Sequence, residues 1–66
     1  MGRTQNVIAE IQERVDEIET EATRLVVFAN SVRDAALSIR LKKIAKVIFK
    51  SATGIEKRLE KLRRAA

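Results

Sequence analysis

Ten apolar residues between Ile8 and Ile39 follow one another at gaps of three or four residues, and no charged residue occupies any position of the series. This is the a and d spacing of a heptad repeat, which keeps one face of a helix against a helical neighbour. The pattern predicts an all-α chain organised by helix packing. The members of this first stripe are Ile8, Ile11, Val15, Ile18, Ala22, Leu25, Ala29, Val32, Ala36 and Ile39.

The chain of 66 residues is one small domain at most, so we expect a single helical domain over residues 1–66. Ordering a chain of this length costs about 100 kcal/mol, at about 1.5 kcal/mol per residue, which a core this small barely offsets. Cys and His are both absent, which excludes disulfides and removes the commonest metal ligand and general base. We therefore expect no enzyme activity, no cofactor or metal, no small-molecule substrate, and stabilisation by self-association.

The segment Leu25–Ala29 is apolar on every side of a helix, which predicts burial in a bundle of four or more helices. Just after it, Asn30 could adopt the left-handed conformation that ends a helix, and Ser31 with Asp34 resembles a weak capping box. We favour a bend at this point that makes a hairpin. The alternative is one long helix, because the heptad continues to Ile39 without a slip and no Gly or Pro intervenes.

A second apolar stripe over residues 37–62 lies on the opposite side of the heptad frame, which also favours a change of packing partner near residues 36–41. Thr4 is the first plausible N-cap of the chain. Thr53 and Glu56 match a capping box, and Gly54 disfavours a continuous helix. The fold we expect is thus a two- or three-helix hairpin-like protomer of an oligomeric bundle or coiled coil, with helices at about 5–29, 31–51 and 54–65.

Charge is divided unevenly between the two halves of the chain. Residues 1–34 carry a net charge of −3 and residues 35–66 a net charge of +8. Such a split indicates either an anionic partner for the basic half or mutual neutralisation of the halves. In a hairpin we expect acidic residues 10–21 to lie beside basic residues 40–50, which explains the split without an outside ligand.

The basic segment 40–50 is the sharpest candidate for binding an external partner. Its cations group on one side of a helix and its apolar residues on the other, as in helices that bind anionic lipid surfaces. Ten Lys and Arg within residues 35–66 could also follow the phosphates of a nucleic acid. The alternative to both is a bundle helix with its lysines in water. The candidate anion-binding residues are Arg40, Lys42, Lys43, Lys46 and Lys50.

The function that this sequence favours is self-association, as an assembly or oligomerisation module, with membrane binding and then nucleic-acid binding as alternatives. We expect a homo-oligomer with three or more helices per core. We also expect a soluble protein with no signal peptide or transmembrane segment, cytoplasmic by default. The predicted interface residues are Ile8, Ile11, Val15, Ile18, Ala22, Leu25, Phe28, Ala29, Val32, Ala36 and Ile39, with Leu41, Ile44, Ile48, Ile55, Leu59 and Leu62 as a second face.

Overall fold

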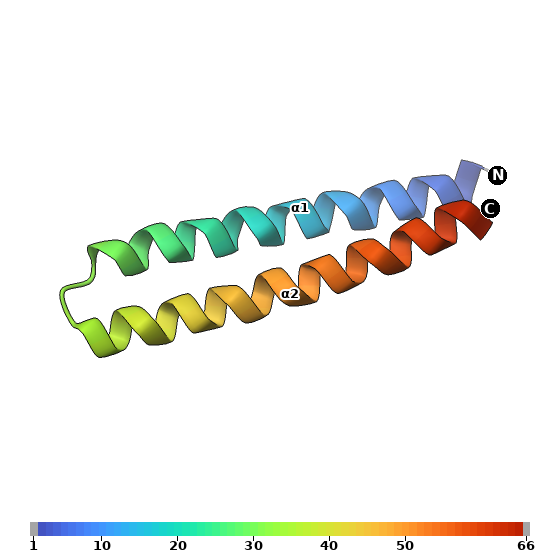
Figure 1. Ribbon diagram of the computed structural model, residues 1–66. Helices are drawn as coiled ribbons and strands as arrows, with labels where there is room; N and C mark the ends of the chain where they lie inside the picture. The colour runs from blue at the N-terminus through green and yellow to red at the C-terminus, as the bar shows by residue number, and fades with distance from the viewer. Residues whose placement is uncertain (1, 66) are drawn as a thin grey trace.

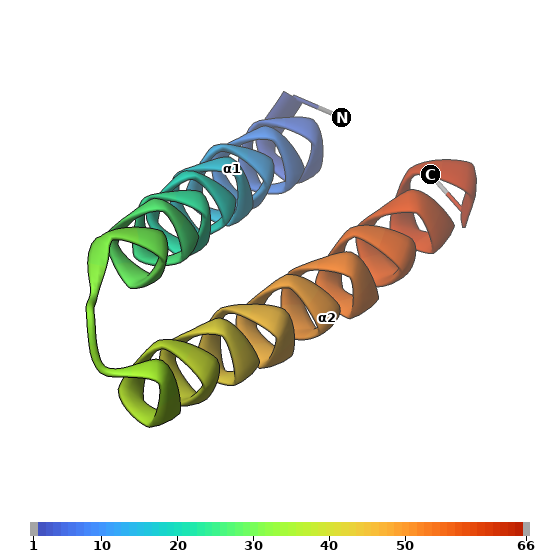
Figure 2. The same cartoon turned by 60° about the vertical axis from the view of Figure 1, so that its left-hand side comes forward.

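A computed structural model describes residues 2–65, which form two helices, α1 (Gly2–Ser31) and α2 (Ala35–Ala65). The helices run antiparallel and pack side by side along their lengths, so that both ends of the chain lie at one end of the molecule (Figures 1 and 2). The hairpin is elongated, with Cα extents of 51 × 15 × 9 Å. The all-α hairpin prediction is confirmed, and the alternative of one long helix is wrong.

The turn between the helices lies slightly later in the chain than the sequence suggested. α1 continues through Asn30 to Ser31, and no residue within 2–65 has a positive φ, so Asn30 does not form a left-handed cap. The Ser31 hydroxyl donates to the Phe28 carbonyl at 2.7 Å instead of starting a new helix. The predicted capping box at Ser31 is therefore wrong, because its first residue belongs to the last turn of α1.

Asp34 caps the start of α2. Its Oδ1 accepts a hydrogen bond from the Leu37 backbone N–H at 3.2 Å, the contact by which an N-cap satisfies a free donor of the first turn. Across the turn, the Ser38 hydroxyl donates to the Ala29 carbonyl at 2.8 Å. These two bonds fix where α2 begins and tie its first turn to the end of α1.

α2 is one continuous helix of 31 residues, so the predicted break between residues 51 and 54 is wrong. Thr53, Gly54 and Glu56 lie inside this helix, and Gly54 is exposed. Burial of Ala52 and Leu59 on either side of Gly54 holds the helix against α1, and this packing outweighs the cost of about 1 kcal/mol for a mid-helix glycine. The N-cap predicted at Thr4 is likewise wrong, because α1 already begins at Gly2.

The core of the hairpin is a narrow seam whose members recur every seventh residue. Within residues 2–65 the buried side chains, each at most 3 % exposed, are Ile8, Val15, Ala22, Ala29, Ala45, Ala52 and Leu59. Half-buried Ser38 completes the series on α2. The bond from Ser38 to Ala29 joins the first turn of α2 to the end of the α1 seam. Small side chains along the seam allow close approach of the two helices.

The first stripe of the sequence does not continue through the turn as one seam. Ala36 and Ile39 are exposed, and Ile39 keeps 54 % of its surface in contact with solvent. The turn at residues 32–34 changes the phase of the chain, so the seam of α2 begins at Ser38 instead. The heptad spacing that continues across the turn is therefore a coincidence of sequence. The prediction that Ala36 and Ile39 are buried in the seam is wrong.

Candidate functional site

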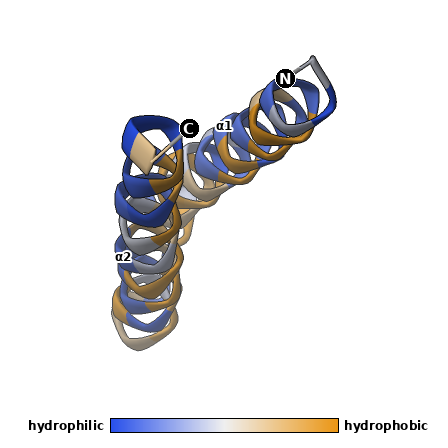
Figure 3. Ribbon diagram, turned by 90° about the vertical axis from the view of Figure 1, so that its right-hand side faces the viewer, coloured by the Kyte–Doolittle hydropathy of each residue, from blue (hydrophilic) through white to orange (hydrophobic). Residues whose placement is uncertain are grey.

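One side of the hairpin carries a continuous row of aliphatic side chains beside the buried seam. We call it the open apolar face. Figure 3 shows the hydrophobic colour along the facing sides of both helices and the hydrophilic colour along their outer sides. The residues of this face are half-buried or exposed: Ile11, Ile18, Leu25 and Val32 from α1, and Leu41, Ile48, Ile55 and Leu62 from α2.

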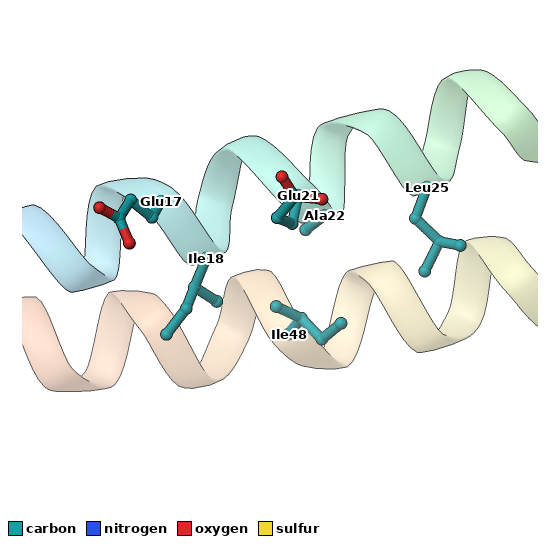
Figure 4. A pocket seen from close by; sticks show the side chains of 6 residues that line it. All are labelled: Glu17, Ile18, Glu21, Ala22, Leu25 and Ile48. Carbon is teal, nitrogen blue, oxygen red and sulfur yellow. The ribbon is translucent and has the colours of Figure 1, made fainter.

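The two helices contribute to this face in equal steps. On each helix the four members of the face are spaced seven residues apart. Figure 4 shows Ile18 and Leu25 projecting from α1 toward α2 on either side of Ile48. Aliphatic side chains of the two helices therefore alternate along the same side of the hairpin.

A groove with a volume of about 430 Å³ runs through the middle of the open apolar face. Ile18, Ala22, Leu25 and Ile48 line it, and Glu17 and Glu21 also border it. Figure 4 shows both carboxylates on α1, away from the aliphatic side chains that cross to α2. Most of the lining is aliphatic, so the groove is suited to packing against apolar side chains.

The surface of the isolated hairpin is large for its mass. It exposes 5520 Å² at 7.5 kDa, whereas a compact monomer of that mass exposes about 4,200 Å² by the usual scaling of area with mass. The excess of about 1,300 Å² is larger than the area of about 800 Å² that each partner buries in a standard protein interface. The open apolar face contributes to this excess.

The opposite edge of the seam is more polar. Half-buried Glu19 of α1 and Glu56 of α2 approach each other there. The pKa of Glu19 is raised above its ordinary value, first by loss of solvent, then by the charge of Glu56 and a hydrogen bond with it, and last by the charge of Asp16. Two carboxylates that share one site disfavour each other's ionised form. This edge therefore carries an electrostatic cost at neutral pH.

The outer side of α2 carries exposed lysines, which we call the lysine face: Lys43, Lys46, Lys50 and Lys57. Lys43, Lys50 and Lys57 each follow a seam position of α2 by five residues, which turns them about 140° from the seam at 100° per residue. Lys42 is also exposed, but it follows Ser38 by four residues and so lies about 40° from the seam. The ion pairs within residues 2–65 all join residues of the same helix, and none involves these lysines. The expected neutralisation of acidic residues 10–21 by basic residues 40–50 therefore does not take the form of ion pairs between the helices.

The predicted interface residues occupy three different environments. Ile8, Val15, Ala22, Ala29 and Leu59 are buried inside the hairpin, whereas most of the others line the open apolar face. Phe28 and Ile44 border that face and are exposed, and Ala36 and Ile39 lie outside it. Of the all-round apolar segment, Ala29 is buried, but Val27 and Phe28 keep 64 % and 59 % of their surface exposed. Val27 and Phe28, which we expected to be buried, are therefore exposed in the single hairpin.

Two buried residues are missing from the predicted interface. Ala45 and Ala52 are 0 % and 2 % exposed and form the middle of the α2 seam. Their signal in the sequence is the seven-residue spacing from Ser38 to Leu59, which small side chains make easy to overlook. Of the predicted anion-binding residues, three lie on the lysine face, whereas Lys42 is exposed beside the seam and Arg40 is exposed at the border of the lysine face.

Residues 2–65 contain no group of three or more Asp, Glu, His or Cys side chains that could hold a metal ion. Neither helix, over the part of the chain that the structure describes, is long and apolar enough to cross a membrane. Comparisons with protein-family models, with curated proteins and with solved structures find no match to this chain.

Proposed function

We propose that this protein is a non-enzymatic self-association module, in which two hairpins pack through their open apolar faces into a four-helix bundle. The supporting observation is the row of eight aliphatic residues on one side of the hairpin, which contributes to an excess of exposed surface larger than one partner's share of a standard interface. Contiguous apolar surface of this kind marks an interaction site. This arrangement meets the expectation of three or more helices per core.

The composition of the face supports a second copy of the chain as the occupant. A twofold axis brings the same patch of both partners together, so a self-complementary patch is required. Each helix supplies four aliphatic side chains to the open apolar face, so two copies supply apolar residues from four helices to one shared core. No charged side chain interrupts the row, and Glu17 and Glu21 beside the groove form ion pairs with Arg14 and Arg24.

Replacing Ile18 and Ile55 with Glu tests this proposal. These two residues lie in the middle part of the face, one on each helix, and are 44 % and 38 % exposed in the single hairpin. Two carboxylates per copy would place four charges in the apolar core of the bundle, which is strongly unfavourable. We expect sedimentation across a concentration series to give a dimer of twice 7.5 kDa for the parent chain, and a monomer for the variant.

The matched control is the pair Ile39→Glu and Val47→Glu. These residues are 54 % and 63 % exposed and lie outside the open apolar face, so the same chemical change leaves association intact. A parent chain that sediments as a well-folded monomer at high concentration would overturn the proposal. A control variant that dissociates as completely as the test variant would show that added charge, not the face, is responsible.

A further inference from the structure

We propose that the lysine face of α2 binds the phosphate backbone of a nucleic-acid duplex, without reading its sequence. The carrying observation is that the lysine face lies on the side of α2 turned away from α1, the helix that carries most of the acidic residues. The ion pairs within the described residues stay inside one helix and leave the lysine face without carboxylate partners. The positive charge of these lysines is therefore available to an external polyanion.

Three of the lysines converge on one place. Lys43, Lys46 and Lys50 line a shallow hollow of about 300 Å³ together with Val47. Lys46 stands three residues after Lys43 and four before Lys50, and like charges at these spacings disfavour the helix that carries them. An anionic group bound in the hollow relieves this repulsion. Phosphate fits the site because Lys donates to it as a compact point charge.

The shape of the lysine face favours a long, stiff polyanion. Lys43, Lys50 and Lys57 are exposed and repeat every seventh residue, or about every 10.5 Å along a helix. A duplex carries about one charge per 1.7 Å of its axis, so a straight row of cations can contact several phosphates and release their counterions. Single strands are a poorer match, because such sites use stacked aromatics and the only aromatics of the chain are Phe28 and Phe49.

A membrane surface is a weaker candidate for the same lysines. A helix on a membrane buries its apolar side while its cations reach lipid phosphates from the flanks. In the hairpin Ala45 is buried against α1, Leu41 and Ile48 belong to the open apolar face, and the lysines stand on the outer side. An anionic surface that contacts the lysines is therefore turned away from the apolar row. The chain also has no Trp or Tyr, the usual interfacial anchors.

This inference does not depend on the proposed function. The lysine face lies on the outer side of α2, so it stays accessible in a single hairpin and in two hairpins joined through their open apolar faces. Self-association doubles the number of lysine faces per particle and strengthens binding by linkage of two sites. Sedimentation of every variant alongside the binding measurement separates the two proposals.

The test is fluorescence anisotropy with labelled 20-base-pair DNA and RNA duplexes, each titrated with the full chain at several salt concentrations. We expect binding to both duplexes that weakens steeply with salt. The variant Lys43→Gln/Lys46→Gln/Lys50→Gln removes three cations from the hollow. We expect tenfold or greater loss of affinity at low salt and a fall of about 3 in the slope of log K against log salt, at about 0.9 per contact.

The matched control is Arg3→Gln/Arg14→Gln/Arg24→Gln, which removes the same charge from α1. Arg14 and Arg24 are exposed and form ion pairs with Glu17 and Glu21, so their loss leaves the lysine face intact. We expect affinity within about twofold to threefold of the parent. Equal losses in the two variants would reduce the effect to net charge and overturn the proposal, as would no binding to either duplex at low salt. Binding of the parent to phosphatidylserine vesicles without binding to duplex would assign the lysines to a membrane surface instead.

Discussion

At the scale of single residues, the hairpin is defined by the size of the side chains in its seam. Four of the seven buried residues within 2–65 are alanines, and Ala29 and Ala45 have no exposed surface. A methyl group contributes little apolar area but allows the backbones to come close. The seam therefore specifies how the helices meet, while the larger aliphatic side chains beside it remain open to solvent.

Glu19 makes the stability of the hairpin depend on pH. Its pKa is raised by desolvation and then by Glu56, so the folded hairpin holds the Glu19 proton more tightly than the unfolded chain. The contribution of Glu19 to stability is therefore largest at acidic pH and declines as pH rises from the ordinary pKa of 4.5 through the raised value. We expect Glu19→Gln to raise the midpoint of thermal unfolding at pH 7 and to flatten its decline between pH 4 and 8.

The control is Glu13→Gln, which changes an exposed carboxylate outside the ion pairs of the described residues. This variant should retain the decline of the parent chain. Circular dichroism melts across the pH range measure both. A Glu19→Gln variant that unfolds at a lower temperature than the parent at pH 7 would contradict the repulsion between Glu19 and Glu56.

At the scale of the helices, α1 and α2 differ in how they end and in what holds them straight. α2 begins at a carboxylate cap on Asp34 and ends with Arg63 and Arg64 in its last turn, where cations favour the negative end of the helix dipole. Gly54 is the residue of α2 with the lowest helix propensity. The helix continues through it because Ala52 and Leu59, on either side, are buried against α1. Packing, more than local propensity, makes α2 one helix.

Replacing Gly54 with Ala tests this account of α2. A Cβ built on Gly54 meets no atom within 4 Å, so alanine fits without displacing a neighbour. We expect the free energy of unfolding to rise by about 0.5–1 kcal/mol, the usual cost of glycine inside a helix. Urea denaturation at one fixed protein concentration measures the change. The control Gly2→Ala alters the first residue of α1 and should change stability far less, because helix ends fray. A loss of stability in Gly54→Ala would mean that α2 requires a distortion there.

At the scale of the whole molecule, the charges beside the open apolar face favour one of two arrangements of a dimer. The border of that face on α2 carries cations, among them Arg58 and Lys61. The border on α1 includes Glu10, Glu17 and Glu21, of which the last two form ion pairs with Arg14 and Arg24. Stacking α1 of one copy on α2 of its partner brings opposite charges together. Stacking α2 on α2 brings like charges together, which is unfavourable. We therefore expect α1 to pack on the partner's α2, which places both turns at the same end of the bundle.

A spin label in the turn distinguishes the two arrangements. The chain has no cysteine, so Arg33→Cys provides one attachment site per copy. Turns at the same end should give a distance between labels of about 10–20 Å, the width of a helical bundle. Turns at opposite ends should give a distance near the length of the hairpin, 51 Å. The long distance would reject this arrangement while leaving self-association intact, and the absence of any intermolecular distance would reject self-association itself.

The sequence by itself determined the helical class, and it favoured the hairpin and the approximate position of its turn over one long helix. Heptad spacing, the absence of proline and the change of apolar face are local properties that a helix expresses whatever it packs against. The sequence also named the residues of the open apolar face, but it assigned them to buried interfaces.

Only the tertiary structure decided which stripe is buried, where α2 begins and which way the lysines point. A heptad repeat defines a face of a helix but does not state which helix covers it. The phase of α2 depends on three turn residues and on the bond from Ser38 to Ala29, which joins residues nine positions apart. The continuity of α2 through Gly54 and the separation of the lysines from the acidic residues follow from that phase, since both depend on contacts between the helices.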